Sequence, residues 1–253
     1  DRGAQTRSHA RAGALFKSSR AVELTESETE YLVRVVKHVF EEHVVLQFNI
    51  TNTLNDQLLT EVSVAVEEQD EEIWEVECVV PATRVPYDVT KHTFVCLKRP
   101  AEEGYPSSAF GCELKFKVQD VDPSTGEPDE DDEGYDEVYP LEELEITAAD
   151  FMAKVMVNDF RTTWEMVGDG AELLEKFQLS SYKTVAEATA AVVDFLGMQP
   201  CEGTAAVPAD ARSHTVLLSG VFIGGIKVLA RTLIALANAD GAQCIVLKIA
   251  LRS

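Results

Sequence analysis

The sequence predicts two modest domains, an immunoglobulin-like β-sandwich followed by a small α/β domain with helices packed on an antiparallel sheet. Apolar residues alternate with a period of two from Tyr31 onward, and the pattern changes to helices mixed with strands after Asp150. The chain of 253 residues also exceeds one typical domain of roughly 100 to 200 residues. We expect residues 1–22 to form a basic flexible linker, 23–148 the sandwich and 149–253 the α/β domain.

Composition and charge limit the classes of partner. The chain is 45% hydrophobic, which is enough apolar material for two cores. Its net charge of −22 argues against nucleic acid or an anionic membrane as a direct partner of the folded part, because both require a concentrated positive field. Five basic residues and one acid lie in residues 1–20, so the linker is a separate element. Such a linker either contacts an acidic lipid surface or keeps a tether soluble.

The first domain is predicted from seven short stretches with strand-like alternation. In one of them Val44, Leu46, Phe48 and Ile50 alternate with polar or exposed positions, which indicates one buried and one solvated face. Turn residues separate the stretches, and no Cys-Trp-Cys arrangement of antibody type is present. The predicted strands lie at residues 31–37, 44–51, 62–66, 74–80, 94–96, 114–118 and 144–146.

A strongly acidic loop is expected between the last two of these strands. Residues 120–137 contain ten acids and no Lys or Arg, so the segment repels itself and should stay solvated. A calcium loop is disfavoured, because Gly126 is the seventh residue from Asp120 instead of the sixth and no helices flank the loop.

The five cysteines form an odd set with no C-x-x-C pair and no histidine at metal-ligand spacing. We therefore expect no disulfide framework and no metal site, but buried or half-buried thiols in a reducing compartment. The longest apolar run, residues 216–226, has 11 residues and ends at Lys227, which is too short to cross a bilayer. Without a recognisable signal peptide, a cytoplasmic protein with no transmembrane segment is expected.

Two helices are predicted in the second domain. Thr184 and Glu187 form a capping box, which is followed by apolar residues at helical spacing and by a stop at Gly197. A shorter helix should begin after the cap Asp159, cover residues 160–167 and end at Gly168. This shorter helix places Phe160 and Trp164 four residues apart on one face. Trp164 is then either a core residue or an interaction hot spot.

The C-terminal segment reads as three strands, at residues 214–219, 226–237 and 243–252. If Asp240-Gly241 is a two-residue turn, Arg231 lies opposite Ala250 and Leu229 opposite Arg252. Arg231, Lys248 and Arg252 then share one face of the sheet. They form either a local basic site on an acidic chain or isolated solubilising charges.

No catalytic constellation or cofactor motif is found in the sequence. The segment 220–227 lacks the Gly-Lys-Ser/Thr ending of a phosphate loop. Ser219 lacks the flanking glycines of a nucleophile elbow, and His214 lies on the same predicted strand. The carboxylates are spread over loops and solvated faces, so no acid/base pair stands out. We expect a protein without enzymatic activity, cofactor or metal.

Several long strings resemble a known family, the γ subunit of the COPI coatomer. They include TNTLNDQLL at 51–59, DPSTGE at 122–127, FLGMQPCE at 195–202 and SHTVLLSGVF at 213–222, and the similarity runs from Leu24 to Ser253. The resemblance implies a β-sandwich followed by a platform domain, as in the ears of clathrin adaptors. It also implies a non-catalytic appendage that functions in transport between the Golgi and the endoplasmic reticulum and within the Golgi, peripheral on Golgi membranes and COPI vesicles.

The resemblance further implies partners and a site. The expected partners are accessory proteins of the coat, including an Arf GTPase-activating protein, and other coatomer subunits reached through a trunk outside this chain. The family's F-x-x-x-W helix falls on Phe160 and Trp164, with basic partners at Arg231 and Arg252. We expect the Trp164 ring to be partly exposed. A purely structural spacer within a coat, or the ear of a clathrin adaptor, is the alternative.

Two departures from the family pattern bear on the platform. The family normally continues past Ser253, and the expectation is that the missing end leaves a platform surface incomplete. The turn near Ala239 is longer than in animal members, so the expected neighbour of Arg231 depends on that turn.

Overall fold

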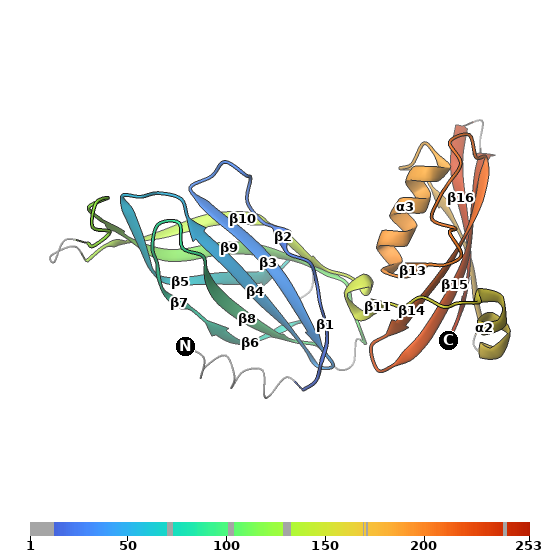
Figure 1. Cartoon of the computed structure of the whole chain (residues 1–253), viewed down its shortest axis with the longest axis horizontal. Coiled ribbons are helices and arrows are strands. Elements are labelled where there is room, and N and C mark those ends of the chain that lie inside the picture. Colours follow the sequence, from blue (N-terminus) through green and yellow to red (C-terminus); the bar gives the residue numbers. More distant parts are fainter. Residues whose placement is uncertain are drawn as a thin grey trace. The chain divides into compact units, whose positions relative to one another are not determined.

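The computed structural model describes residues 13–69, 73–100, 104–128, 133–168, 170, 172–239 and 242–253. The chain divides into two compact units, Asp1–Thr147 and Ala148–Ser253. Figure 1 shows the first as a set of strands coloured blue to yellow-green and the second as an orange-red sheet with helices. The second unit is called the platform below.

The first unit consists of two antiparallel sheets. One has the order β1-β3-β4-β8-β6, with β2 also pairing with β3, and the other has the order β10-β9-β5-β7 (Figure 1). The strands of the first sheet are β1 (Leu15–Ser18), β2 (Val22–Glu23), β3 (Tyr31–Phe40), β4 (His43–Asn52), β6 (Glu75–Val80) and β8 (Lys91–Lys98). Those of the second are β5 (Gln57–Glu68), β7 (Ala82–Val85), β9 (Ser108–Asp120) and β10 (Tyr135–Ile146).

The two sheets face each other across an apolar core, which confirms the predicted sandwich. Val44, Leu46, Phe48 and Ile50 on β4 are all buried, as their alternation predicted. The Tyr31 ring of β3 meets a β9 ring across the core, with 4.8 Å between the two ring centroids. On β4 the outer face is not wholly solvated, because Val45 is buried in a small apolar cluster there.

The structure contains more strands than the seven predicted. Among the described residues the first unit has ten strands. Three of them were not predicted: β1 and β2, which begin within the expected linker and pair with β3, and the short strand β7. Residues 1–12 of that predicted linker lie outside the described residues. In the acidic segment, residues 122–127 are exposed as expected. The last residues of the segment belong to β10, which begins at Tyr135. Residues 129–132 of this segment lie outside the description.

Strand β6 corrects one prediction. Trp74, Val76, Cys78 and Val80 were expected to share a buried face, but Val76 is 46% exposed and Cys78 is exposed. Two features explain the difference: β6 is the edge strand beside β8, and its register shifts between Val76 and Cys78. A bulge interrupts the alternation of side chains, and an edge strand has only one neighbour to cover it. The other four cysteines are buried.

The platform is an antiparallel sheet with helices on both faces. Its order is β11-β14-β15-β16-β12, with β13 also pairing with β14. The strands are β11 (Met152–Lys154), β12 (Glu172–Leu179), β13 (Gln199–Pro200), β14 (Ser213–Phe222), β15 (Ile226–Ala239) and β16 (Ala242–Arg252). The helices are the 3-10 turn η1 (Ala148–Phe151), α2 (Phe160–Val167) and α3 (Val185–Leu196).

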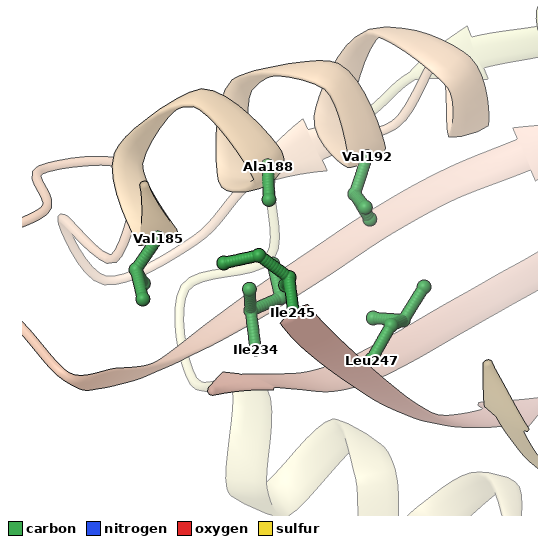
Figure 2. Close-up of a cluster of buried hydrophobic side chains, with 6 residues drawn as sticks. All are labelled: Val185, Ala188, Val192, Ile234, Ile245 and Leu247. Atoms are coloured by element: carbon green, nitrogen blue, oxygen red, sulfur yellow. The ribbon is translucent and has the colours of Figure 1, made fainter. Parts of the chain in front are cut away.

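Helix α3 forms as predicted and covers one face of the sheet. The Thr184 side chain accepts from the Glu187 N–H, and the Glu187 carboxylate accepts from the Thr184 N–H, which completes the capping box. Figure 2 shows Val185, Ala188 and Val192 pointing from α3 toward side chains of β15 and β16. The apolar side chains that they meet are Ile234, Ile245 and Leu247. No helix in the described part of the chain is long and apolar enough to cross a membrane.

Strand β12 was not predicted. The sequence ELLEKFQL has no alternation of apolar and polar residues. This agrees with the structure, where both faces of the strand are exposed except near its ends. Pairing with β16 makes it a strand, with Glu172 opposite Arg252 and Lys176 opposite Lys248. Pairing at the edge of the sheet therefore makes this segment a strand. Strand β12 also adds residues to the candidate site.

Candidate partner-binding site

Helix α2 positions the two aromatic residues of the candidate site. Asp159 caps the helix, because its Oδ1 accepts from the Thr162 N–H at 2.8 Å. That backbone hydrogen bond, followed by the Thr162 hydroxyl, lowers the pKa of Asp159. Phe160 and Trp164 lie on the inner face of α2 and stack, with 5.6 Å between ring centroids. The predicted short helix and its cap are therefore confirmed.

The sheet brings two arginines over the indole ring. Arg231 on β15 pairs with Ala250, and Leu229 pairs with Arg252, which is the register that the sequence predicted. The guanidinium carbons of Arg231 and Arg252 lie 5.2 and 4.5 Å from the Trp164 ring centroid. Both separations are within the range of a cation–π interaction.

Arg252 is fixed in place by two further contacts. Its Nη1 donates to the Trp164 carbonyl oxygen at 3.0 Å, and its Nε donates to the Glu172 carboxylate on β12. Both side chains of this ion pair are largely buried. Arg252 therefore links α2 and β12 to β16. Arg231, in contrast, is exposed.

The Trp164 ring itself is not the exposed anchor that we expected. Only 7% of the residue is accessible, and Phe160 is also buried. The ring packs in a cluster with Cys201, Leu229 and Ala250, while the arginines cover its outer side. The expectation of a partly exposed ring was therefore wrong, because the register that brings the arginines close also places them over the indole.

A basic hollow lies on the same face of the sheet and was only partly predicted. It has a volume of about 550 Å³, and its rim carries Arg231, Lys248 and Lys176. Leu174, which is 66% exposed, and Leu233 supply its apolar part. Lys176 and Lys248 are direct cross-strand neighbours, and like charges in such pairs repel. The hollow is lined by Leu174, Glu175, Lys176, Thr215, Arg231, Leu233, Lys248, Ile249 and Ala250.

The structure therefore arranges the five predicted site residues in two layers. Phe160, Trp164 and Arg252 form a buried support, and Arg231 and Lys248 reach the surface above and beside it. Sequence reasoning missed Leu174 and Lys176, because both lie on the unpredicted strand β12. Their only sequence signal is the mixture of charged and apolar residues in ELLEKFQL, which does not distinguish a strand from a loop.

The two units have the architecture that the sequence resemblance implies for the appendage region of a coat subunit, a β-sandwich and a platform. Residues 3–147 match the family described as the coatomer gamma subunit appendage platform subdomain, and residues 149–253 match the coatomer subunit gamma-1 C-terminal appendage platform. The chain belongs to the coatomer subunit gamma family. Appendage domains of this family are structural parts of a coat and not enzymes.

Individual relatives support this placement. Over 242 residues the chain is 48% identical to coatomer subunit gamma-1 of Oryza sativa subsp. japonica, which covers 95% of this chain. Over 227 residues it is 47% identical to coatomer subunit gamma-2 of Homo sapiens, which covers 89%. The aligned region is 27% and 26% of the length of these relatives.

A solved structure is similar only at a low level. The crystal structure described as the yeast GGA1 GAE domain-P21 is aligned with 48% of this chain and 98% of its own. The TM-score is 0.30 and the sequence identity 8%, and a score this low does not establish a shared fold.

Proposed function

We propose that this chain is the appendage of a COPI vesicle coat and that its platform recruits accessory proteins through the basic hollow. Family membership supports the coat role. The observation that carries the binding role is the hollow itself, whose lining has three basic side chains, one acid and two exposed leucines on a chain of net charge −22. Such a combination suits an acidic segment that also offers apolar side chains.

The buried aromatic layer has a supporting role in this proposal. Trp164 holds Arg231 by a cation–π contact, and Arg252 ties the helix to the sheet. An arginine whose position is already fixed loses less conformational entropy when it binds a carboxylate. The platform thus presents Arg231 in a defined place beside Lys248.

The proposal also includes the partners of the appendage and its location in the cell. The accessory proteins include an Arf GTPase-activating protein, and the other coatomer subunits are reached through the remaining part of the subunit. The appendage acts peripherally on Golgi membranes and COPI vesicles, in transport from the Golgi to the endoplasmic reticulum and within the Golgi. Family membership supports this setting at the level of the coat.

Charge reversal in the hollow tests the proposal. Lys248→Glu and Arg231→Glu should each weaken binding of an Arf GTPase-activating protein roughly tenfold or more, because an attraction becomes a repulsion. Lys183→Glu changes the charge equally at an exposed position outside the hollow, so it should bind like the parent chain. Titration at low and high ionic strength should show weaker binding in salt.

Two outcomes would count against this function. Equal loss in Lys183→Glu would show that only net charge matters and that the hollow is not the site. A well-folded chain that retains no accessory protein from cytosol would favour the structural spacer instead.

A further inference from the structure

A cluster of metal-ligating side chains lies in the first unit, away from the platform. His43 begins β4, Glu77 lies in β6 and Cys96 in β8. One ligand atom from each, the imidazole Nε2, a carboxylate oxygen and the thiol sulfur, lie within 4.8 Å of one another. The His43 Nε2 is 3.0 Å from the Glu77 Oε2, and the Cys96 Sγ is 3.9 Å from the same oxygen.

Strand register and a bulge bring these residues together. Strand β8 lies between β4 and β6, and Cys96 is opposite Val45 on one side and Cys78 on the other. The register of β6 shifts between Val76 and Cys78, so Glu77 has no partner in the ladder. A bulge of this kind redirects a side chain, and here Glu77 points across β8 to His43.

Two of the three side chains are withdrawn from water. His43 is 7% exposed and Cys96 is 6% exposed, whereas Glu77 and Cys78 are accessible. The Nδ1 atom of His43 has no hydrogen-bond partner among the described residues, so Glu77 supplies the polar contact of this ring. A buried ring nitrogen without a hydrogen-bond partner costs free energy, so the surroundings of His43 are not fully satisfied by the described residues.

We propose that His43, Glu77 and Cys96 bind one divalent transition-metal ion, with Zn²⁺ as the best chemical match. Tetrahedral ligands at zinc distances are separated from one another by about 3.3–3.7 Å. The three ligand atoms lie within 4.8 Å of one another, so side-chain movements on the order of 1 Å would bring them to these separations. Imidazole and thiolate ligands favour zinc over calcium or magnesium, which prefer oxygen. Cys78 is the cross-strand neighbour of Cys96, and a water molecule would complete the four ligands of the ion.

The site would act as a structural clasp. Its ligands come from three adjacent strands, and β6 is the exposed edge of the sheet. Zinc would therefore tie an edge strand to the interior strand β4 and stabilise the folded state by its binding free energy.

The experiment uses the whole chain, freed of metal with a chelator and kept reduced. Titration with Co²⁺ should give one bound ion per chain and a sulfur-to-cobalt charge-transfer band, and Zn²⁺ should displace the cobalt. Removal of a ligand in Cys96→Ala or Glu77→Gln should weaken zinc binding at least roughly tenfold, since even the loss of an outer-shell partner has an effect of that size. Zinc should also raise the melting temperature of the parent chain.

The controls separate ligand loss from general damage. Cys112→Ala removes another buried thiol of the same unit, on β9 of the opposite sheet, and should leave the cobalt band unchanged. Glu77→Gln acts at an accessible edge position, so it should fold normally and serves if Cys96→Ala is unstable. Absence of the charge-transfer band in the parent chain, or an unchanged band in both ligand variants, would overturn the proposal.

Discussion

At the scale of single residues, Trp164 was a candidate for two roles, an exposed binding residue or a buried core residue. We expected its ring to bind a partner directly. In the structure the residue is only 7% exposed, and its ring stacks on Phe160. Two arginines lie over the ring, and Arg252 is also held by the Trp164 carbonyl oxygen and the Glu172 carboxylate. We propose that the tryptophan contributes to the binding site by holding Arg231 in place.

Truncation of this ring should reduce stability. Trp164→Ser opens a cavity in the cluster of α2 and the sheet and should lower the free energy of unfolding by about 3–5 kcal/mol. Met166, which is on the same helix and 81% exposed, gives the control: Met166→Ser should change it by less than about 0.5 kcal/mol. Urea denaturation of the two variants measures the difference. If Trp164→Ser unfolds like the parent chain but loses its partner, the ring is a contact surface after all.

At the scale of elements, the end of α3 depends on one glycine. Gly197 has φ +61°, and a Cβ atom there would lie 2.8 Å from the Cβ of Ala149 in η1. Both the left-handed conformation and the close approach exclude a side chain. The C-terminus of α3 can therefore lie against η1 only because this residue is glycine.

A pair of glycine variants separates the two effects. Gly224 also has a positive φ, of +84°, but no atom lies within 4 Å of the position of its Cβ. Gly224→Ala should cost about 1 kcal/mol of stability for the backbone conformation alone. Gly197→Ala should cost about 1–3 kcal/mol more, because an atom is forced into a packed contact. Equal losses in thermal or urea unfolding would show that η1 moves aside without cost.

At the scale of the whole molecule, the acidic segment between β9 and β10 is the clearest surface feature of the first unit. Asp122 closes a turn by accepting from the Ser124 N–H at 2.8 Å, and residues 122–127 are exposed. Exposed polar loops are the least protected backbone and are cut first by proteases.

Limited proteolysis should follow this map. A protease of broad specificity should cut within residues 122–127 before it cuts next to Glu137, because Glu137 is paired with Phe116 in the sheet. Early cleavage is also expected before Leu15, whereas β1 should be protected by its pairing with β3. Mass spectrometry of the first fragments measures the order. Resistance throughout residues 122–127 would mean that the segment is docked and not solvated.

The sequence by itself determined the elements whose signals are local. The alternation in β4, the caps of α2 and α3 and the register of β15 with β16 each depend on neighbouring residues or on one turn, so they were predicted before the structure. Similar long strings also determined the family, which the comparisons confirmed.

Only the tertiary structure decided features that depend on pairing between distant segments. Strand β12 has no period of its own and becomes a strand because β16 offers a free edge, and this pairing completes the basic hollow. The burial of Trp164 depends on α2 lying against the sheet beneath two arginines. His43, Glu77 and Cys96 are too far apart in sequence for any spacing rule, and strand order with one bulge brings their ligand atoms together. Side-chain surroundings of this kind follow from long-range contacts, which local sequence patterns do not specify.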